Sequence, residues 1–187
     1  MIKSKEMKLF YTLLVSLSFF AANAQNTFAD SLKYQMVQEW ERAKSYTQEY
    51  LNAMPADKYD FRPTDSVRSF AQQMLHLAGA NALMASVAMG VPNPFPTQNF
   101  EKSPSLQNKD SVVYYVNTSY DVMIAAIKNM DVSKLNEEVT RNLPGGKRVT
   151  TRFGWLLKAF EHQTHHRGQC TVYFRLLGLR PPAEKLF

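Results

Sequence analysis

Four long segments of the chain place apolar residues three or four positions apart, which is the spacing of one face of an α-helix. The segments are residues 29–53, 69–89, 110–130 and 151–177. In the first segment the repeat consists of Leu32, Met36, Trp40, Ala43, Tyr46 and Tyr50. The pattern therefore predicts four amphipathic helices.

Short signals at the ends of these segments indicate where the helices begin and end. Ser69 and Gln72 have the spacing of a capping box, which predicts that the second helix starts at Ser69, and Gly90 is expected to end it. Thr151 is the expected N-cap of the fourth helix, and Gly178 is its expected C-cap.

The connections between the segments indicate how the helices are arranged. Residues 90–109 form a long proline-rich crossover, and a loop of this length in a compact domain needs a physical reason. Such a loop is needed if the second and third helices run parallel, because the chain must then travel the full length of the bundle between them. Residues 54–68 are a polar loop, and residues 137–150 resemble a hairpin around a Pro-Gly-Gly turn. We expect an all-α fold, a four-helix bundle in up-down-down-up order.

The first 24 residues have the composition of a secretory signal peptide. A short lead with three lysines precedes an apolar run at residues 9–20, and Ala22 and Ala24 occupy the small-residue positions of a cleavage site. An uncleaved anchor is the alternative, although the run is short for a transmembrane helix. We expect removal of residues 1–24, a single mature domain of residues 25–187 that is periplasmic or secreted, and no membrane contact after cleavage.

Charge and cysteine content exclude several function classes. The formal net charge is +6 for the whole chain and +4 without the signal, and the basic residues are scattered among acidic ones. Nucleic-acid binding requires a basic patch or run, so we expect no nucleic-acid partner. Cys170 is the only cysteine, which excludes an internal disulfide and a paired-thiol redox site. We expect it to be a small buried apolar residue and not a nucleophile.

Three of the four histidines lie in the stretch FEHQTHHRGQ, residues 160–169. His162 and His166 are four positions apart, so on a helix they share one face and can reach one metal ion. His165 is rotated well away from His166. The shared face is the inward one, because it also carries Trp155, Ala159, Cys170, Tyr173 and Leu177.

His76 lies inside the second predicted helix, where the small residues Gly79 and Ala80 leave room beside it. Together with His162 and His166 it would form a three-imidazole site with open positions, suited to a divalent transition metal such as Zn²⁺, Ni²⁺, Fe²⁺ or Mn²⁺. Spacing alone leaves a second interpretation open, because such histidine pairs also arise by chance and a lone core histidine is usually a packing residue.

The segment EHQTHHRGQCTVYFRLLGLRPP resembles the C-terminal signature of the DinB-like family, also called DinB/YfiT-like metalloenzymes. The segment MPADKYDFRPTDSVRSFAQQMLHLAGAN resembles the first loop and second helix of that family, and the resemblance covers about residues 29–183. It implies an up-down-down-up four-helix bundle with a triad of metal-binding histidines. Matched position by position, the triad is His76, His162 and His166, and His165 is a non-ligand.

The neighbours of the triad have weaker expected roles. Arg167 and Gln169 belong to the same signature; we expect a structural salt bridge for Arg167 and a supporting contact to a ligand or water for Gln169. Glu161 is expected outside the coordination sphere, since it lies about 100° around the helix from His162. Tyr173 could donate a proton, but a packed tyrosine with a bonded hydroxyl is the more frequent case. The sequence identifies no catalytic base.

The resemblance also suggests chemistry. Some family members resemble S-transferases that join low-molecular-weight thiols to electrophiles, with a metal that lowers the thiol pKa, and others are suspected hydrolases. This chain would then be a transferase or hydrolase of a small molecule, although predicted export departs from the intracellular location of those thiols. Metal binding without turnover and a purely structural metal remain alternatives. A homodimer through helix faces is also expected, with Tyr114, Tyr115 and Phe100 as exposed aromatic residues.

Overall fold

The structure, a computed structural model, describes residues 4–95, 100–143 and 145–187, with side chains from residue 28 onward. The four helices are α1 Ser4–Ala53, α2 Phe70–Met89, α3 Lys109–Lys128 and α4 Arg152–Leu176. All four predicted helices are confirmed, and the predicted ends lie within two residues of the observed ones, except at the start of α1.

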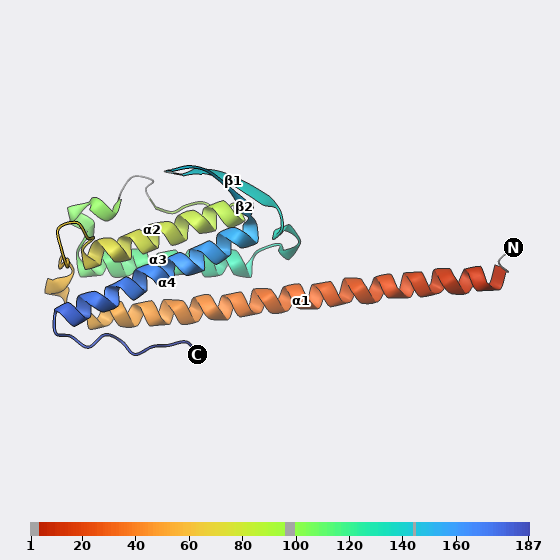
Figure 1. The fold of residues 1–187 in the computed structure, drawn as a ribbon, viewed down its shortest axis with the longest axis horizontal. Helices are drawn as coiled ribbons and strands as arrows, with labels where there is room; N and C mark the ends of the chain where they lie inside the picture. Colours follow the sequence, from red (N-terminus) through yellow and green to blue (C-terminus); the bar gives the residue numbers. More distant parts are fainter. Residues whose placement is uncertain (1–3, 96–99, 144) are drawn as a thin grey trace.

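The first helix is longer than its apolar pattern predicts. It contains 50 residues, and its N-terminal part extends beyond the other helices in Figure 1. The predicted signal segment, residues 1–24, lies outside the part of the chain whose side chains are described, so its cleavage stays a prediction. Within the described residues, no helix combines the length and the apolar character needed to cross a bilayer.

The helices form a bundle in up-down-down-up order (Figure 1). α2 and α3 run side by side in the same direction, whereas α1 and α4 run the opposite way. α2 packs closely against both α3 and α4, and α1 packs mainly against α3. The fold class and the parallel pair that the long crossover predicted are both confirmed. This order makes α2 and α4 antiparallel neighbours, and those helices carry the predicted metal ligands.

Short elements fill the connections. The 3₁₀ turns are η1 Ala56–Lys58, η2 Phe100–Lys102, η3 Pro104–Leu106 and η4 Val132–Lys134. The predicted hairpin is present as two antiparallel strands, β1 Glu138–Leu143 and β2 Gly146–Thr151. Gly145 and Gly146 have φ values of 90° and 114°, a backbone region that glycine enters without steric cost.

The ends of the helices follow local side-chain chemistry. At the start of α2 both bonds of the capping box are present: the Gln72 amide donates to Ser69 Oγ at 3.2 Å, and the Ser69 amide donates to Gln72 Oε1 at 3.0 Å. Thr151 Oγ1 caps α4 by accepting from the Gly154 amide at 3.0 Å. Gly90 and Gly178 both have φ of 71° just beyond their helices, as expected for left-handed termination.

The core of the bundle is rich in aromatic rings that join different helices. Trp40 of α1 is 1% exposed and packs edge to face on Tyr120 of α3 and Phe160 of α4, with centroid distances of 5.8 and 5.5 Å. Such pairs add about 0.5–1.5 kcal/mol each beyond the burial of their apolar area. Trp40 therefore fixes α1 against two of its neighbours.

The predicted salt bridge of Arg167 is wrong. The side chain is buried, and its guanidinium donates to Gln163 Oε1 at 2.5 Å and to Thr47 Oγ1 at 3.3 Å. It also lies over the ring of Tyr46, 4.6 Å from the centroid. Among the described residues no carboxylate pairs with it. Neutral acceptors and an aromatic face replace the expected acid, and these contacts join α1 to α4.

The aromatic residues predicted to be exposed on a dimer face are only partly so. Tyr114 is 62% exposed. Tyr115 and Phe100 pack against each other with centroids 5.2 Å apart, and Phe95 lies 5.2 Å from Tyr115 and 5.6 Å from Phe100. The crossover thus folds back onto α3 and covers these two rings, which the sequence pattern could not show. A homodimer stays a prediction.

Candidate metal centre

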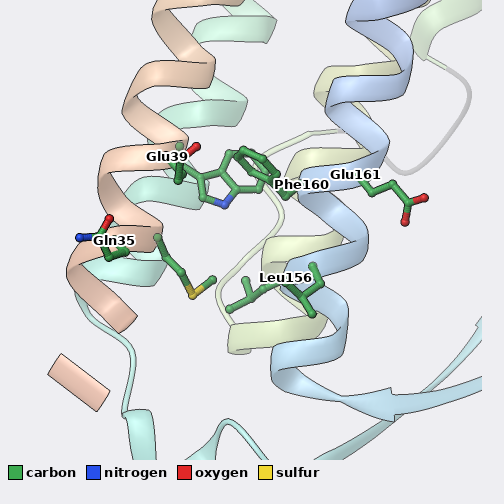
Figure 2. Close-up of a pocket in the computed structure, with 8 residues that line it drawn as sticks. Gln35, Glu39, Leu156, Phe160 and Glu161 are labelled. Carbon is green, nitrogen blue, oxygen red and sulfur yellow. The ribbon is translucent and has the colours of Figure 1, made fainter. Parts of the chain in front are cut away.

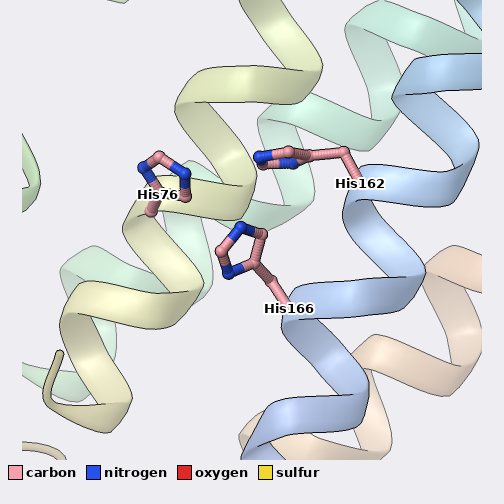
Figure 3. Close-up of side chains that lie close together, drawn as sticks. All are labelled: His76, His162 and His166. Atoms are coloured by element: carbon pink, nitrogen blue, oxygen red, sulfur yellow. The ribbon is translucent and has the colours of Figure 1, made fainter. Parts of the chain in front are cut away.

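Three histidines converge between α2 and α4 (Figure 3). His76 comes from α2, and His162 and His166 come from successive turns of α4. Each offers one ring nitrogen, and the three nitrogens lie within 4.8 Å of one another. The ring centroids are separated by 5.1, 4.6 and 4.4 Å. The group could hold a metal ion, and it contains the three residues that the sequence predicted.

The two histidines of α4 are held in the neutral form. Burial, together with the charges of the neighbouring histidines and Arg68, lowers the pKa of His162 to about 4 and that of His166 to about 3. Both rings are therefore unprotonated near pH 7. Metal ligands must be neutral imidazoles, so a metal ion does not have to displace protons from these two side chains.

A carboxylate from the crossover orients the ring of His76. Glu101 Oε2 lies 2.7 Å from His76 Nδ1, and Arg68 Nη2 pairs with Glu101 Oε1 at 3.2 Å. Burial alone would raise the pKa of Glu101, but hydrogen bonds and charges from His76 and Arg68 outweigh it and lower the pKa. The ionised carboxylate can only accept, so Nδ1 carries a hydrogen, and in the neutral ring Nε2 then keeps the lone pair.

An amide orients the ring of His166 in the same way. Gln73 Oε1 lies 2.7 Å from His166 Nδ1. Gln73 Nε2 donates to Gln169 Oε1 at 2.8 Å and to the Tyr173 hydroxyl at 3.2 Å. These two acceptors fix which way the amide points, so its oxygen faces the ring. His166 therefore donates from Nδ1 and keeps its lone pair on Nε2.

His162 lacks such support. Its Nδ1 is buried and has no hydrogen-bond partner within the described ranges. A buried polar nitrogen without a partner costs free energy. The side chains nevertheless fit a divalent transition metal, because partners on the outer nitrogens orient two of the rings and the third ring is neutral.

The sequence that builds this centre matches a family model. The model of the DinB family covers residues 24–186. The chain belongs to the DinB family. The predicted resemblance is therefore confirmed over nearly the whole predicted mature domain.

Other DinB proteins share the fold along most of their length. "Uncharacterized protein YjoA" of Bacillus subtilis (strain 168) is 25% identical over 145 residues, which is 77% of this chain and 90% of that protein. The crystal structure of YjoA has a TM-score of 0.59 at 22% identity and covers 82% of this chain and 96% of its own. A DinB-like protein from Bacillus cereus ATCC 10987 has a TM-score of 0.67 at 19% identity, with coverages of 80% and 95%. At these identities the likeness to solved structures shows the fold.

The fourth histidine of this DinB chain lies outside the group. His165 is exposed, and its Nε2 lies 2.9 Å from Gln169 Nε2. Gln169 was expected to support a ligand or water; its Oε1 accepts from Gln73, whose own Oε1 contacts His166 Nδ1. The geometry therefore fits three ligating histidines with His165 as a non-ligand, and these roles stay predictions.

Tyr173 is engaged in the packing rather than free to donate a proton. It is 2% exposed, its hydroxyl donates to the Arg68 carbonyl oxygen at 2.5 Å, and it accepts from Gln73. The hydroxyl thereby links the loop before α2 to the amide that holds His166. This arrangement agrees with the packed tyrosine that the sequence favoured.

Glu101 and Gln73 are the site residues that sequence reasoning missed. Gln73 precedes His76 by three positions on α2 and is buried, so a polar residue on an inward stripe was an available signal. Glu101 gave no such signal, because it lies in η2 of the crossover, where no periodicity relates it to a helix face. Only the folded chain shows that it meets His76.

Glu161 lies on a different face of α4 from the triad, as expected. It is exposed at the edge of an apolar groove of about 290 Å³ between α1 and α4 (Figure 2). The apolar residues that line the groove include Met36, Trp40, Leu156 and Phe160, and no histidine lines it. Its lining offers no donor set for a metal, so we place the candidate site at the triad.

Cys170 is expected to be chemically inert in the folded protein. The side chain is fully buried, and burial raises the pKa of its thiol, so the reactive thiolate is scarce. A disulfide reagent should therefore modify the native protein far more slowly than the same protein in denaturant, as followed by absorbance. Equal rates in the two conditions would contradict the buried assignment.

Proposed function

We propose that this DinB protein is an exported, divalent-metal-dependent enzyme that acts on a small molecule, as a thiol S-transferase or a hydrolase, through His76, His162 and His166. The observation that carries the proposal is the convergence of three imidazoles from two helices, two of them kept neutral by burial. Three protein ligands leave coordination positions open, which is typical of catalytic sites. Zn²⁺, Ni²⁺, Fe²⁺ and Mn²⁺ all suit this donor set.

A cleft lies on the outer side of the triad, next to Arg68 and Gln73, and none of the three histidines lines it. The cleft has a volume of about 420 Å³, and its walls include Arg68, Gln73, Gln169, Val172 and Tyr173. That volume lies in the range of small-molecule pockets. Arg68 and Gln73 also contact His76 and His166, so a molecule bound in the cleft would lie next to the residues that hold the ligands.

The residues of the chain supply binding and orientation. When bound, a divalent ion at the triad would act as a Lewis acid towards a thiol or a water molecule. Glu101 and Gln73 keep the rings of His76 and His166 in fixed tautomers. The guanidinium of Arg68, whose side chain is 39% exposed and pairs with Glu101, offers hydrogen-bond donors to the cleft, and Val172 contributes apolar surface. These walls suit a small substrate with an apolar part and a hydrogen-bond acceptor.

Metal content is the first test of the proposed function. Protein purified without chelators from its exported location is expected to contain about one equivalent of a transition metal per chain by elemental mass spectrometry. The N-terminal sequence of the same sample should begin at Gln25. A metal content near zero that added Zn²⁺, Ni²⁺, Fe²⁺ or Mn²⁺ does not restore would overturn the metal-dependent function and leave the histidines as packing residues.

A further inference from the structure

We propose that Glu101 is the positioning residue of the metal centre: its carboxylate fixes His76 in the tautomer whose Nε2 can bind a metal, and Arg68 holds the carboxylate in place. The inference rests on the proposed metal-binding function and adds a specific role for the crossover between α2 and α3. The surroundings of the carboxylate, the hydrogen bonds at His76 and the packing of the crossover on α2 all support this role.

Protein groups hydrogen-bond to the Glu101 carboxylate in place of the water that it loses on burial. Its side chain is 13% exposed, and a charge taken out of water costs free energy unless partners replace the water. Oε2 contacts His76 Nδ1 at 2.7 Å, and Oε1 accepts from Arg68 Nη2 at 3.2 Å and Nε at 3.4 Å. Both oxygens are thus engaged, and the shorter contact is to the histidine.

The hydrogen bonds at Nδ1 of His76 select one of the two tautomers of the neutral ring. Arg68 Nη2 also lies 3.4 Å from His76 Nδ1, and a guanidinium can only donate, so it would require a lone pair at that nitrogen. The carboxylate requires a hydrogen there. The carboxylate contact is much shorter at 2.7 Å and is strengthened by charge, so it decides the tautomer. Nε2 of His76 is then the nitrogen left for a metal.

Packing of the crossover on α2 brings the carboxylate to His76. Phe100 fits against Gly79, one turn after His76, so closely that an added Cβ would lie 2.7 Å from Phe100 Cε1. Gln107 Nε2 donates to the Glu101 carbonyl oxygen at 2.9 Å and so holds the backbone of η2, the turn that contains both Phe100 and Glu101. Phe100 thus fills the space beside Gly79. This contact holds the crossover in the position where the Glu101 carboxylate reaches the His76 ring.

A carboxylate on the outer nitrogen of a metal-binding histidine has a known physical effect. It fixes the orientation of the ring and increases the basicity of the nitrogen that binds the metal. Loss of such a partner typically weakens metal affinity by about 10–100-fold. A side chain that merely filled space would have no such effect on the metal once the protein is folded.

The affinity experiment compares Glu101→Ala with Glu137→Ala. Glu137 is the matched control, because its carboxylate also pairs with an arginine, Arg152, at 2.9 Å but lies beside the hairpin and outside the histidine group. Co²⁺ is titrated into metal-free protein in competition with a chelator, with folding checked by circular dichroism. We expect an affinity loss of about 10–100-fold for Glu101→Ala and none for Glu137→Ala. Unchanged affinity in Glu101→Ala, or an equal loss in both, would overturn the proposal.

A second measurement reads the tautomer of His76 without any metal. Nitrogen-15 NMR of the imidazole rings, with assignment through a His76→Gln variant, should show His76 protonated at Nδ1 in the unchanged protein. In Glu101→Ala the Nε2-protonated form should appear. No change of tautomer would contradict the role of Glu101. If Glu101→Ala does not fold, Glu101→Gln takes its place in both experiments, with a smaller loss of affinity expected because the amide oxygen still accepts.

The two proposals fail in different ways. If the unchanged protein binds no Co²⁺, the metal-dependent function is rejected, and the tautomer measurement still decides whether Glu101 fixes His76. If the unchanged protein binds Co²⁺ and Glu101→Ala binds it equally well, the metal centre stands and the role of Glu101 is rejected.

Discussion

A His166→Ala variant is expected to lose most of its bound metal. The change removes one of the three converging imidazoles and leaves the amide of Gln73 without its ring partner. Because loss of a residue that supports a ligand costs about 10–100-fold in metal affinity, loss of the ligand itself is expected to cost more than about 100-fold. Dissociation constants measured by chelator competition, with elemental analysis of the purified variant, give the result.

His165→Ala is the matched control for that experiment. His165 precedes His166 by one position on α4 but is exposed and outside the converging group. Its replacement should leave metal affinity unchanged. Equal loss in both variants would reject the assignment of His165 as a non-ligand, and full retention in both would reject His166 as a ligand.

A Trp40→Ala variant is expected to lower the free energy of unfolding by about 3–5 kcal/mol, the usual cost of replacing a large core aromatic residue with alanine. Trp40 is 1% exposed and meets Tyr120 and Phe160 edge to face, so its removal opens a cavity where α1, α3 and α4 join. Urea unfolding of the metal-free protein, followed by circular dichroism, measures the change.

Tyr34→Ala supplies the comparison for Trp40. Tyr34 lies on the same helix and is 61% exposed, so its removal should change the free energy of unfolding by no more than about 0.5 kcal/mol. A similarly small effect of Trp40→Ala would show that this aromatic cluster does not hold α1 in the bundle.

Much of the fold could be predicted from the sequence, because the positions where helices begin and end are set by residues close to them in the chain. The Ser69–Gln72 capping box and the Thr151 cap act within one turn, so the pattern alone identifies them. The start of α3 was less visible: Asn108 caps it through Oδ1, which accepts from the Ser111 amide at 2.9 Å. The start of α1 was missed, because the segment before residue 29 shows the composition of a signal and its helical state does not depend on the bundle.

The candidate site divides into a predictable and an unpredictable part. Helix geometry puts His162 and His166 on one face, but spacing does not say which face of α2 meets them. The position of His76 inside the second predicted helix made it a candidate, and resemblance to the family matched it to the third ligand. Two features could not be predicted: the contact of Glu101 with His76 and the neutral partners of Arg167. Both depend on packing between segments far apart in the sequence, which no local pattern encodes.

The division of the triad between two helices would govern when a metal could bind. His76 lies on α2, and its partners lie on α4, far along the chain, so the three nitrogens come together only after the bundle has closed. A chain still emerging from synthesis or passing through a translocation pore offers at most the pair on α4. The identity of an ion bound there would therefore depend on the metals available where folding is completed, because affinity order alone would favour Cu²⁺ over Zn²⁺, Ni²⁺, Fe²⁺ and Mn²⁺.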